Sequence, residues 1–211
     1  MAFYQRYIFP WILDQVMQHP RLMQLRHDLL AGVQGEVLEI GFGTGLNTLA
    51  YPHQGLHLHA LDVNPGVARR ARRRLQAFPL PVRHATLDGQ SLPFADASFD
   101  AVVSTWTLCS IPDVARALAE IHRVLRRDGV FFYVEHGLHA DAAIARWQHR
   151  LTPLQKRLGD GCHLDRDIDA LLRAAGFDTR DGRRFRADGL PAIFGYMYQG
   201  RARRQDSVHS G

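Results

Sequence analysis

Lysine is almost missing from this 211-residue chain, because 25 of its 26 basic residues are Arg and only Lys156 is Lys. Glutamate is scarce as well, since 17 of the 21 acidic residues are Asp. Such a bias indicates a G+C-rich genome rather than an adaptation to a binding partner. The formal net charge of +5 is therefore weak evidence for nucleic-acid binding.

Cysteine and long apolar runs are also scarce. Two cysteines 53 residues apart, Cys109 and Cys162, make neither a disulfide framework nor a four-ligand zinc site, and they fit a reducing cytoplasm. No uninterrupted apolar stretch reaches 18 residues, so no transmembrane segment is expected, and the N-terminus lacks the basic region and cleavage site of a secretory signal. A composition of 46% hydrophobic and 22% charged residues is that of a soluble globular domain and excludes collagenous and wholly disordered chains.

The chain divides into an arm, one domain and a tail. Residues 1–30 are predicted to be a helical arm, which Pro10 should break or restart. Three interpretations of the arm stay open: a helix packed on the core, a lid over a ligand site, or a peripheral contact with a membrane surface. Residues 31–200 form the predicted domain, and the basic tail, residues 201–211, is predicted to be disordered.

Short apolar segments alternate with helical patterns through the first two thirds of the domain. Strands are predicted at residues 36–40, 56–62, 82–87, 98–104 and 130–134, and a late pair surrounds Phe185 and residues 193–198. Helices are predicted from Asn47 onward and over residues 65–77, 112–127 and 165–175. This alternation indicates an α/β fold with a Rossmann-like, mostly parallel seven-stranded sheet, helices on both faces and an antiparallel last strand.

A glycine-rich turn follows the first predicted strand. Gly41, Gly43 and Gly45 give the spacing G-x-G-x-G, whereas a dinucleotide fingerprint needs a glycine where Leu46 stands. A nicotinamide cofactor is therefore disfavoured, although the turn still lets the backbone approach a ligand closely.

Two acids follow the next two strands. Asp62 ends the second strand, 21 residues after Gly41, where a carboxylate can accept both hydroxyls of an adenosine ribose. The alternative is that Asp62 only caps the following helix. Asp88 follows the third strand and could accept from an adenine amino group, but taken alone it is better explained as a turn residue.

Together these segments resemble a known family. Glu36 to Gly45, the acid at Asp62, the Leu92-Pro-Phe to Phe99-Asp100 segment and Leu125 to Gly129 resemble class I S-adenosylmethionine-dependent methyltransferases. More narrowly, Val134-Glu135-His136, residues 159–167 and the Phe9-Pro10-Trp11 segment resemble the small methyltransferase-like proteins that methylate thiols in mammals. A second relative in pattern is the bacterial phosphatidylethanolamine N-methyltransferase group.

The resemblance implies S-adenosylmethionine as cofactor, S-adenosylhomocysteine as product, and a set of cofactor contacts. The three glycines would let the backbone approach the methionine part, Phe42 and Asn47 would be further cofactor contacts, and Glu39 would orient this loop and complement the positive charge of the donor. Asp62 would bind the ribose. The remaining implied contacts are Val63, Asp88 and Gly89 at the adenine and Thr105 and Trp106 near the methyl group.

On the acceptor side the candidates are less specific. His136 follows the fifth strand and is the candidate general base, with a structural histidine as the equal alternative. Tyr7, Trp11, His136, Cys162 and His163 are the candidate substrate contacts. Nucleophilic catalysis by Cys162 is disfavoured, Cys109 is expected to be a small buried residue, and the pairs His57/His59 and His136/His139 are not expected to hold a metal.

The favoured function is methyl transfer from S-adenosylmethionine to a small-molecule acceptor, with a thiol as the leading choice. A phospholipid or amine N-methyltransferase is the alternative. An alternative of another class is a nucleic-acid-binding module that uses the arginine-rich face Arg69–Arg74, although no specific nucleic acid is expected. The sequence leaves monomer and homodimer both open.

Overall fold

The computed structural model describes residues 8–64, 67–86 and 88–205. Helices and strands alternate along the chain as the sequence predicts. The elements are α1 (Phe9–Met17), α2 (Pro20–Leu30), β1 (Gly35–Ile40), η2 (Leu46–Leu49), β2 (Leu56–Asp62), α3 (Ala68–Ala77), β3 (Val82–Thr86), β4 (Phe99–Thr105), α4 (Val114–Val124), β5 (Leu125–His136), α5 (Ala142–Leu158), α6 (Ile168–Ala174), β6 (Phe177–Asp178), β7 (Arg183–Arg186) and β8 (Tyr196–Arg204).

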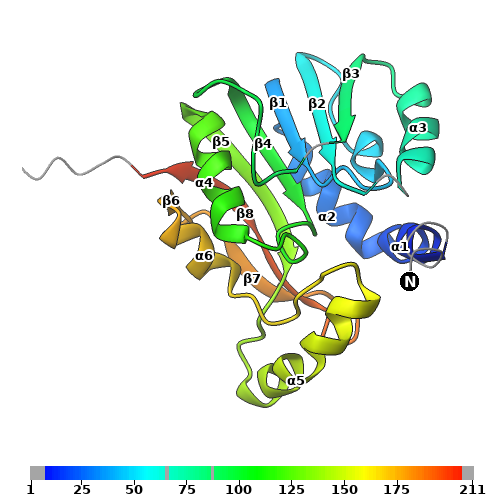
Figure 1. Cartoon of the computed structure of the whole chain (residues 1–211), viewed down its shortest axis with the longest axis vertical. Helices are drawn as coiled ribbons and strands as arrows, with labels where there is room; N and C mark the ends of the chain where they lie inside the picture. The colour runs from blue at the N-terminus through cyan, green and yellow to red at the C-terminus, as the bar shows by residue number, and fades with distance from the viewer. Residues whose placement is uncertain (1–7, 65–66, 87, 206–211) are drawn as a thin grey trace, which may run out of the picture.

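One sheet runs through the molecule in the order β3-β2-β1-β4-β5-β8-β6, and β7 also pairs with β8 (Figure 1). Strands β1 to β5 are parallel to their neighbours, and β8 is antiparallel to β5. The predicted α/β fold is thus confirmed. The sheet has eight strands rather than seven because the segment beside β8 is divided into β6 and β7, which pair with different parts of β8.

Apolar side chains on the two faces of the sheet form two core clusters. Val37 and Val103 lie in one cluster with leucines of α2, and Leu38 and Val102 lie in the other with Leu118 of α4. Successive residues of a strand point to opposite faces, so buried strands such as β1 and β4 supply both clusters. Helices therefore cover both faces, with α4 and α6 on one side and α2 on the other (Figure 1).

Several predicted boundaries differ in the structure. The helix expected from Asn47 is only the short 3₁₀ turn η2, since Pro52 disfavours helical backbone at the residue before it. The predicted tail begins inside a strand, because β8 continues through Arg204 and Ala202 pairs with Phe131 of β5. Residues 206–211 lie outside the described part of the chain. Among the described residues no helix is long and apolar enough to cross a membrane.

The described part of the predicted arm forms two helices, α1 and α2, and α1 begins at Phe9, next to Pro10, where the sequence predicts a break or restart. Pro10 lies in the first turn of α1, where a missing N–H costs no hydrogen bond. Asp14 is 5% exposed and joins α1 to α3, because Arg74 donates to its Oδ1 at 2.7 Å and Arg70 lies 3.5 Å from its Oδ2. Part of the proposed nucleic-acid face is therefore used inside the protein. Arg70 and Arg74 therefore do not form a free basic face, because both guanidinium groups contact Asp14 and hold α1 in place.

Replacing this buried acid should release α1 from α3. We expect Asp14→Ala to lower the free energy of unfolding by about 2 kcal/mol, because Arg74 loses a charge-assisted hydrogen bond. Urea unfolding of Asp14→Ala, Arg74→Ala and the double variant measures this. The double variant should cost clearly less than the sum of the single variants, and additive costs would contradict the contact.

Candidate active site

The ends of four parallel strands meet at one edge of the sheet. Ile40 of β1 is in register with Leu61 of β2 on one side and Ser104 of β4 on the other, and Thr105 is opposite Val134 of β5. The segments that follow these strands carry most of the predicted site. Ligands of open α/β sheets bind at this carboxyl edge, so the topology brings the candidate residues together.

The glycine-rich turn after β1 has a backbone that other residues rarely adopt. Gly41, Gly43 and Gly45 have φ values of 75°, 56° and 81°. A side chain at Gly41 would overlap Thr107, so the turn packs directly against the segment after β4. At Gly43, by contrast, an added Cβ would meet only the Gly41 carbonyl oxygen at 3.8 Å, which leaves room for a ligand beside the backbone.

Asp62 connects this turn to the end of β2. Its Oδ2 accepts from the Gly43 N–H at 2.6 Å and its Oδ1 accepts from the Asn64 N–H at 2.7 Å. Burial raises the pKa of this carboxyl above its ordinary value. Each carboxylate oxygen can accept a second hydrogen bond, so the two backbone contacts fix the carboxylate and leave acceptor capacity for a ligand.

A buried polar network lies beneath the turn. Glu39 is 1% exposed and accepts from Asn47 Nδ2 at 2.9 Å and from the Tyr51 hydroxyl at 2.7 Å. Asn47 Oδ1 accepts in turn from Nε of the buried Arg26 at 3.0 Å, and Asn47 Nδ2 also lies 3.1 Å from Thr105 Oγ1. This network couples α2, β1, η2 and β4. It makes Glu39 and Asn47 supports of the loop, in line with the predicted orienting role of Glu39.

The charges of this network are strongly affected by burial. Loss of water raises the pKa of Glu39 to about 8 and lowers the pKa of Arg26 to about 10, while each charge favours the other. The Arg26 guanidinium also lies 4.6 Å from the ring centroid of Trp106. A cation bound near Glu39 would stabilise its ionised form.

The candidate adenine contacts lie at the same edge but differ in how exposed they are. Val63 is 61% exposed and presents an apolar surface next to Asp62, while Gly89 is buried against Ile40, with 3.0 Å from an added Cβ to Ile40 Cγ2. Asp88 is exposed and accepts from the Gln90 N–H at 2.9 Å, the arrangement of a turn residue. Its contact with adenine stays a prediction.

Backbone strain occurs where β4 ends. Trp106 has a φ of 51°, unusual for a bulky residue, and its indole nitrogen is buried without a hydrogen-bond partner. The next turn is fixed by Glu135, whose Oε1 accepts from Ser104 Oγ, Thr107 N and Leu108 N at 2.8, 3.0 and 3.1 Å. Burial raises the pKa of Glu135 to about 8. Through Oε1, Glu135 therefore fixes the turn after β4, while its Oε2 is buried without a hydrogen-bond partner among the described residues.

The segment after α5 lies over this edge (Figure 1). Asp160 Oδ2 accepts from Asn64 Nδ2 at 2.8 Å, which joins the segment to the end of β2. At its other end the His163 N–H donates to the Cys109 carbonyl oxygen at 2.8 Å. The segment 159–163 thus spans from β2 to the loop after β4, across the predicted cofactor position.

Three candidate side chains meet here: Cys109 after β4, His136 at the end of β5 and Cys162 in the segment 159–163. His136 Nε2 lies 3.1 Å from Cys162 Sγ, and Cys109 Sγ lies within 4.8 Å of both ligand atoms. The hydrogen bond from Cys162 and the nearby His136 ring lower the pKa of the Cys109 thiol. Burial acts to lower the pKa of His136, but the Cys109 sulfur more than offsets it and the pKa is raised. Cys162 engages Nε2, while Nδ1 is buried without a hydrogen-bond partner among the described residues, so His136 is not placed as a solvent-accessible base in this conformation.

The remaining substrate candidates are not all brought to the edge. His163 is half-buried, and its Nδ1 lies 3.1 Å from the Cys109 carbonyl oxygen. Trp11 is 54% exposed on α1. Tyr7 lies outside the described residues.

Sequence reasoning missed Arg26, Tyr51, Asn64 and Arg166. Arg26 was detectable in principle, because it follows Leu22 by four residues and precedes Leu30 by four, on the apolar stripe of α2. Arg166 donates to the Leu108 and Ile111 carbonyl oxygens and so holds the loop that carries Cys109. No local pattern indicates this long-range contact.

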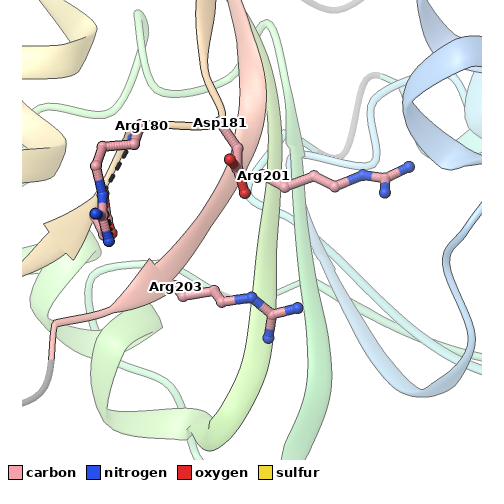
Figure 2. Close-up of a pocket in the computed structure, with 5 residues that line it drawn as sticks. Arg180, Asp181, Arg201 and Arg203 are labelled. Atoms are coloured by element: carbon pink, nitrogen blue, oxygen red, sulfur yellow. Dashed lines mark hydrogen bonds and ion pairs between the residues drawn. The ribbon is translucent and has the colours of Figure 1, made fainter.

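A pocket of about 280 Å³ lies elsewhere, between β8 and the turn after β6 (Figure 2). Arg180, Asp181, Arg201 and Arg203 line it, and Arg180 is paired with Asp178. Arg201 is in register with Phe132, four residues before the end of β5. This charged surface pocket is therefore not part of the carboxyl edge.

Comparisons with known proteins show which proteins this chain resembles. The family described as "Methyltransferase domain" matches residues 38–133. The chain is 36% identical to "Thiol S-methyltransferase TMT1B" of Rattus norvegicus over 70% of this chain and 63% of that protein, so it spans less than two thirds of this relative. It is 34% identical to "Thiol S-methyltransferase TMT1A" of Homo sapiens, over 89% of this chain and 84% of that protein.

Two further similarities bear on the acceptor and on the fold. The chain is 30% identical to "Phosphatidylethanolamine N-methyltransferase" of Cereibacter sphaeroides, over 74% of this chain and 77% of that protein. A solved structure described as a SAM-dependent methyltransferase from Methanosarcina mazei superposes with a TM-score of 0.67 at 22% identity, covering 85% of this chain and 96% of the other. The last similarity concerns the fold alone.

Proposed function

The chain belongs to the class I S-adenosylmethionine-dependent methyltransferases, and on this basis we propose that it transfers a methyl group to a small-molecule thiol. The observation that carries the choice of a thiol is the 34% identity to a human thiol S-methyltransferase over 84% of its length. The cofactor is S-adenosylmethionine, and the thiol acceptor is our proposal.

The carboxyl edge fits this cofactor in four respects. Gly43 leaves open space beside its backbone, Asp62 is a fixed acceptor for ribose hydroxyls, and Val63 offers an exposed apolar surface for a base. Glu39 is a buried carboxyl that a positively charged donor would ionise. Buried polar groups of this kind, next to strained backbone at Trp106, are typical of ligand sites.

When bound, S-adenosylmethionine supplies an activated methyl group, so the protein needs mainly to bind and orient. Asp62 and the glycine turn would hold the adenosine and methionine parts, and the network of Arg26, Asn47 and Glu39 keeps the turn in place. The segment 159–163 would exclude water from above. Alignment of the acceptor with the methyl group supplies several kcal/mol of the barrier reduction.

The state of the nearby groups favours an acceptor that needs little help to ionise. Glu135 Oε1 holds three hydrogen bonds and His136 Nε2 is engaged by Cys162, while the unpartnered Glu135 Oε2 and His136 Nδ1 are buried, so neither residue is placed as a solvent-accessible general base. A thiol with a pKa of about 8.5 is a few per cent thiolate at neutral pH. An amine of pKa about 10 must first lose a proton, and neither Glu135 nor His136 offers a solvent-accessible group to remove it.

A competition between acceptors tests the proposal. The full-length protein is given methyl-labelled S-adenosylmethionine with an aryl thiol and with vesicles containing phosphatidylethanolamine, and products are identified by mass. We expect the S-methyl thioether as the labelled product. N-methylated lipid in place of the thioether would refute the thiol and support the second candidate, which the 30% identity to a phosphatidylethanolamine N-methyltransferase suggests.

A further inference from the structure

The chain contains only two cysteines, and both lie in one buried cluster with a histidine. Cys109, His136 and Cys162 are 2%, 8% and 8% exposed, and their ligand atoms all lie within 4.8 Å of one another. Within residues 8–64, 67–86 and 88–205, no other group of three His, Cys, Asp or Glu side chains gathers in this way. Three metal-ligating groups therefore meet from the loop after β4, the end of β5 and the segment after α5.

The ligand atoms of the cluster lie near the separations of a tetrahedral zinc site. With Zn–S bonds of ~2.3 Å and Zn–N bonds of ~2.0 Å, tetrahedral ligand atoms stand roughly 3.5–3.8 Å apart. The His136 Nε2 to Cys162 Sγ distance of 3.1 Å would have to open by about half an ångström, and all three separations already lie below 4.8 Å.

The charge of the donor set also suits a buried ion. Two thiols that each release a proton become two thiolates, and together with neutral imidazole their two negative charges balance a divalent cation. A neutral assembly avoids the large cost of leaving a net charge in a site shielded from water. Thiolate and imidazole are the ligands that zinc prefers, whereas magnesium and calcium prefer oxygen.

We propose that Cys109, His136 and Cys162 form a zinc-binding site that keeps its fourth coordination position open. This departs from the sequence prediction, which gave no metal site because the two cysteines are far apart in the chain. Three protein ligands with one open position are typical of catalytic rather than structural zinc. The open position is the natural place for the sulfur of an acceptor thiol, and this second part rests on the proposed function.

The supporting contacts hold the segments that carry the ligands. Arg166 holds the loop around Cys109 through the Leu108 and Ile111 carbonyl oxygens. The His163 N–H holds the same loop through the Cys109 carbonyl oxygen. Gly161 lies close to this loop as well, since an added Cβ would stand 3.1 Å from the Ser110 carbonyl oxygen. The segment 159–163 thus brings Cys162 to the other two ligands.

Zinc binding would act on the acceptor by a simple proton balance. The acceptor thiol gives its proton to solvent as its sulfur takes the open position, which leaves one negative charge on the assembly for the positively charged donor to offset, and the bound thiolate remains a nucleophile for the methyl group. In the transfer the new S–CH₃ bond forms as the methyl–sulfonium bond of the donor breaks, which yields thioether and S-adenosylhomocysteine. This explains how a site without a free general base would use a thiol at neutral pH.

Metal binding is tested on the full-length, reduced protein. Zinc content is measured by elemental analysis, and the chelator-treated protein is titrated with Co²⁺ while absorption is recorded. The wild type should bind close to one equivalent, and Co²⁺ should produce a thiolate-to-cobalt charge-transfer band. Cys109→Ser, Cys162→Ser and His136→Gln should each bind zinc at least tenfold more weakly. His149→Gln is the matched control, because His149 is an exposed histidine paired with Asp165 and should change nothing.

The outcomes separate the site from the proposed function. Equal zinc binding by the double variant Cys109→Ser/Cys162→Ser, or a wild type whose cysteines oxidise to a disulfide and bind no cobalt, would overturn the metal site. Binding of S-adenosylhomocysteine confirms that each variant is folded. If zinc binds and chelation lowers thiol methylation at least tenfold, both parts stand. Zinc binding with no thiol methylation keeps the site and refutes the thiol, while methylation that chelation leaves unchanged refutes the open position and keeps the thiol.

Discussion

Asp62→Ala is expected to weaken S-adenosylmethionine binding about 100-fold. Two hydrogen bonds from ribose hydroxyls to a charged carboxylate are worth about 3 kcal/mol together, and each 1.4 kcal/mol is a factor of ten in affinity. The variant also removes the acceptor of the Gly43 and Asn64 N–H groups, which adds disorder in the glycine turn. Calorimetric titration of the full-length protein measures the loss.

Two further variants serve as comparisons for the Asp62→Ala result. Asp62→Asn keeps one acceptor oxygen and should lose less affinity than Asp62→Ala. Asp181→Ala removes an acid near β8, away from the carboxyl edge, and should bind the cofactor like the wild type. Wild-type affinity in a folded Asp62→Ala protein would show that Asp62 only caps the turn, the alternative that its two backbone contacts also allow.

The second large effect concerns Glu39 and pH. Because the pKa of Glu39 is about 8 in the folded protein and 4.5 in the reference state, the folded chain keeps a proton that the unfolded chain loses. The contribution of Glu39 to stability is therefore full below pH 4.5 and is lost as pH rises to 8, at up to about 1.4 kcal/mol per pH unit. Glu135, also raised to about 8, acts in the same direction.

Glu39→Gln should therefore make stability less dependent on pH. Urea unfolding at pH 6 and pH 8 should show a smaller loss of stability for the variant than for the wild type. Glu120→Gln is the control, because the pKa of Glu120 is lowered to about 2 by its hydrogen bond with Arg123 and Glu120 does not titrate in this range. An unchanged difference between the two pH values in Glu39→Gln would contradict the raised pKa.

The Glu39 carboxyl should also make the pH dependence of binding differ between the donor and the product. S-adenosylmethionine carries a positive charge that S-adenosylhomocysteine lacks, so donor binding should strengthen from pH 6 to pH 8 more than product binding does. Both pH profiles should become alike in Glu39→Gln. Equal pH profiles for the two ligands in the wild type would place the sulfonium away from Glu39.

The parts of the site that follow a strand directly were predictable from the sequence. The glycine turn and Asp62 are fixed by local signals, namely a strand, a turn and an acid in order, and the structure brings them together. Helix α5 was missed because its pattern is weak: Trp147 and Leu154 are exposed, and Pro153 lies inside the helix. Its polar N-cap, Asp141, was the one usable signal, since the side chain accepts from Ala143 N and Ile144 N.

Long-range contacts were not predictable. Arg26 belongs to a helix that precedes the domain in sequence, and only tertiary packing places it against Asn47 and Trp106. Cys109, His136 and Cys162 are separated by more than 20 residues in each case, so spacing gives no hint that they meet. The Arg69–Arg74 run suggested a surface because a charge pattern does not reveal Asp14 as an internal partner.

The most direct test of the site is a crystal structure of the full-length protein with S-adenosylhomocysteine. We predict that the ligand lies along the Gly41–Gly45 turn, with its ribose hydroxyls on the Asp62 carboxylate, its adenine beside Val63 and residues 159–163 above it. A ligand bound elsewhere, or at this edge without a contact between ribose and Asp62, would contradict the assignment of the cofactor site.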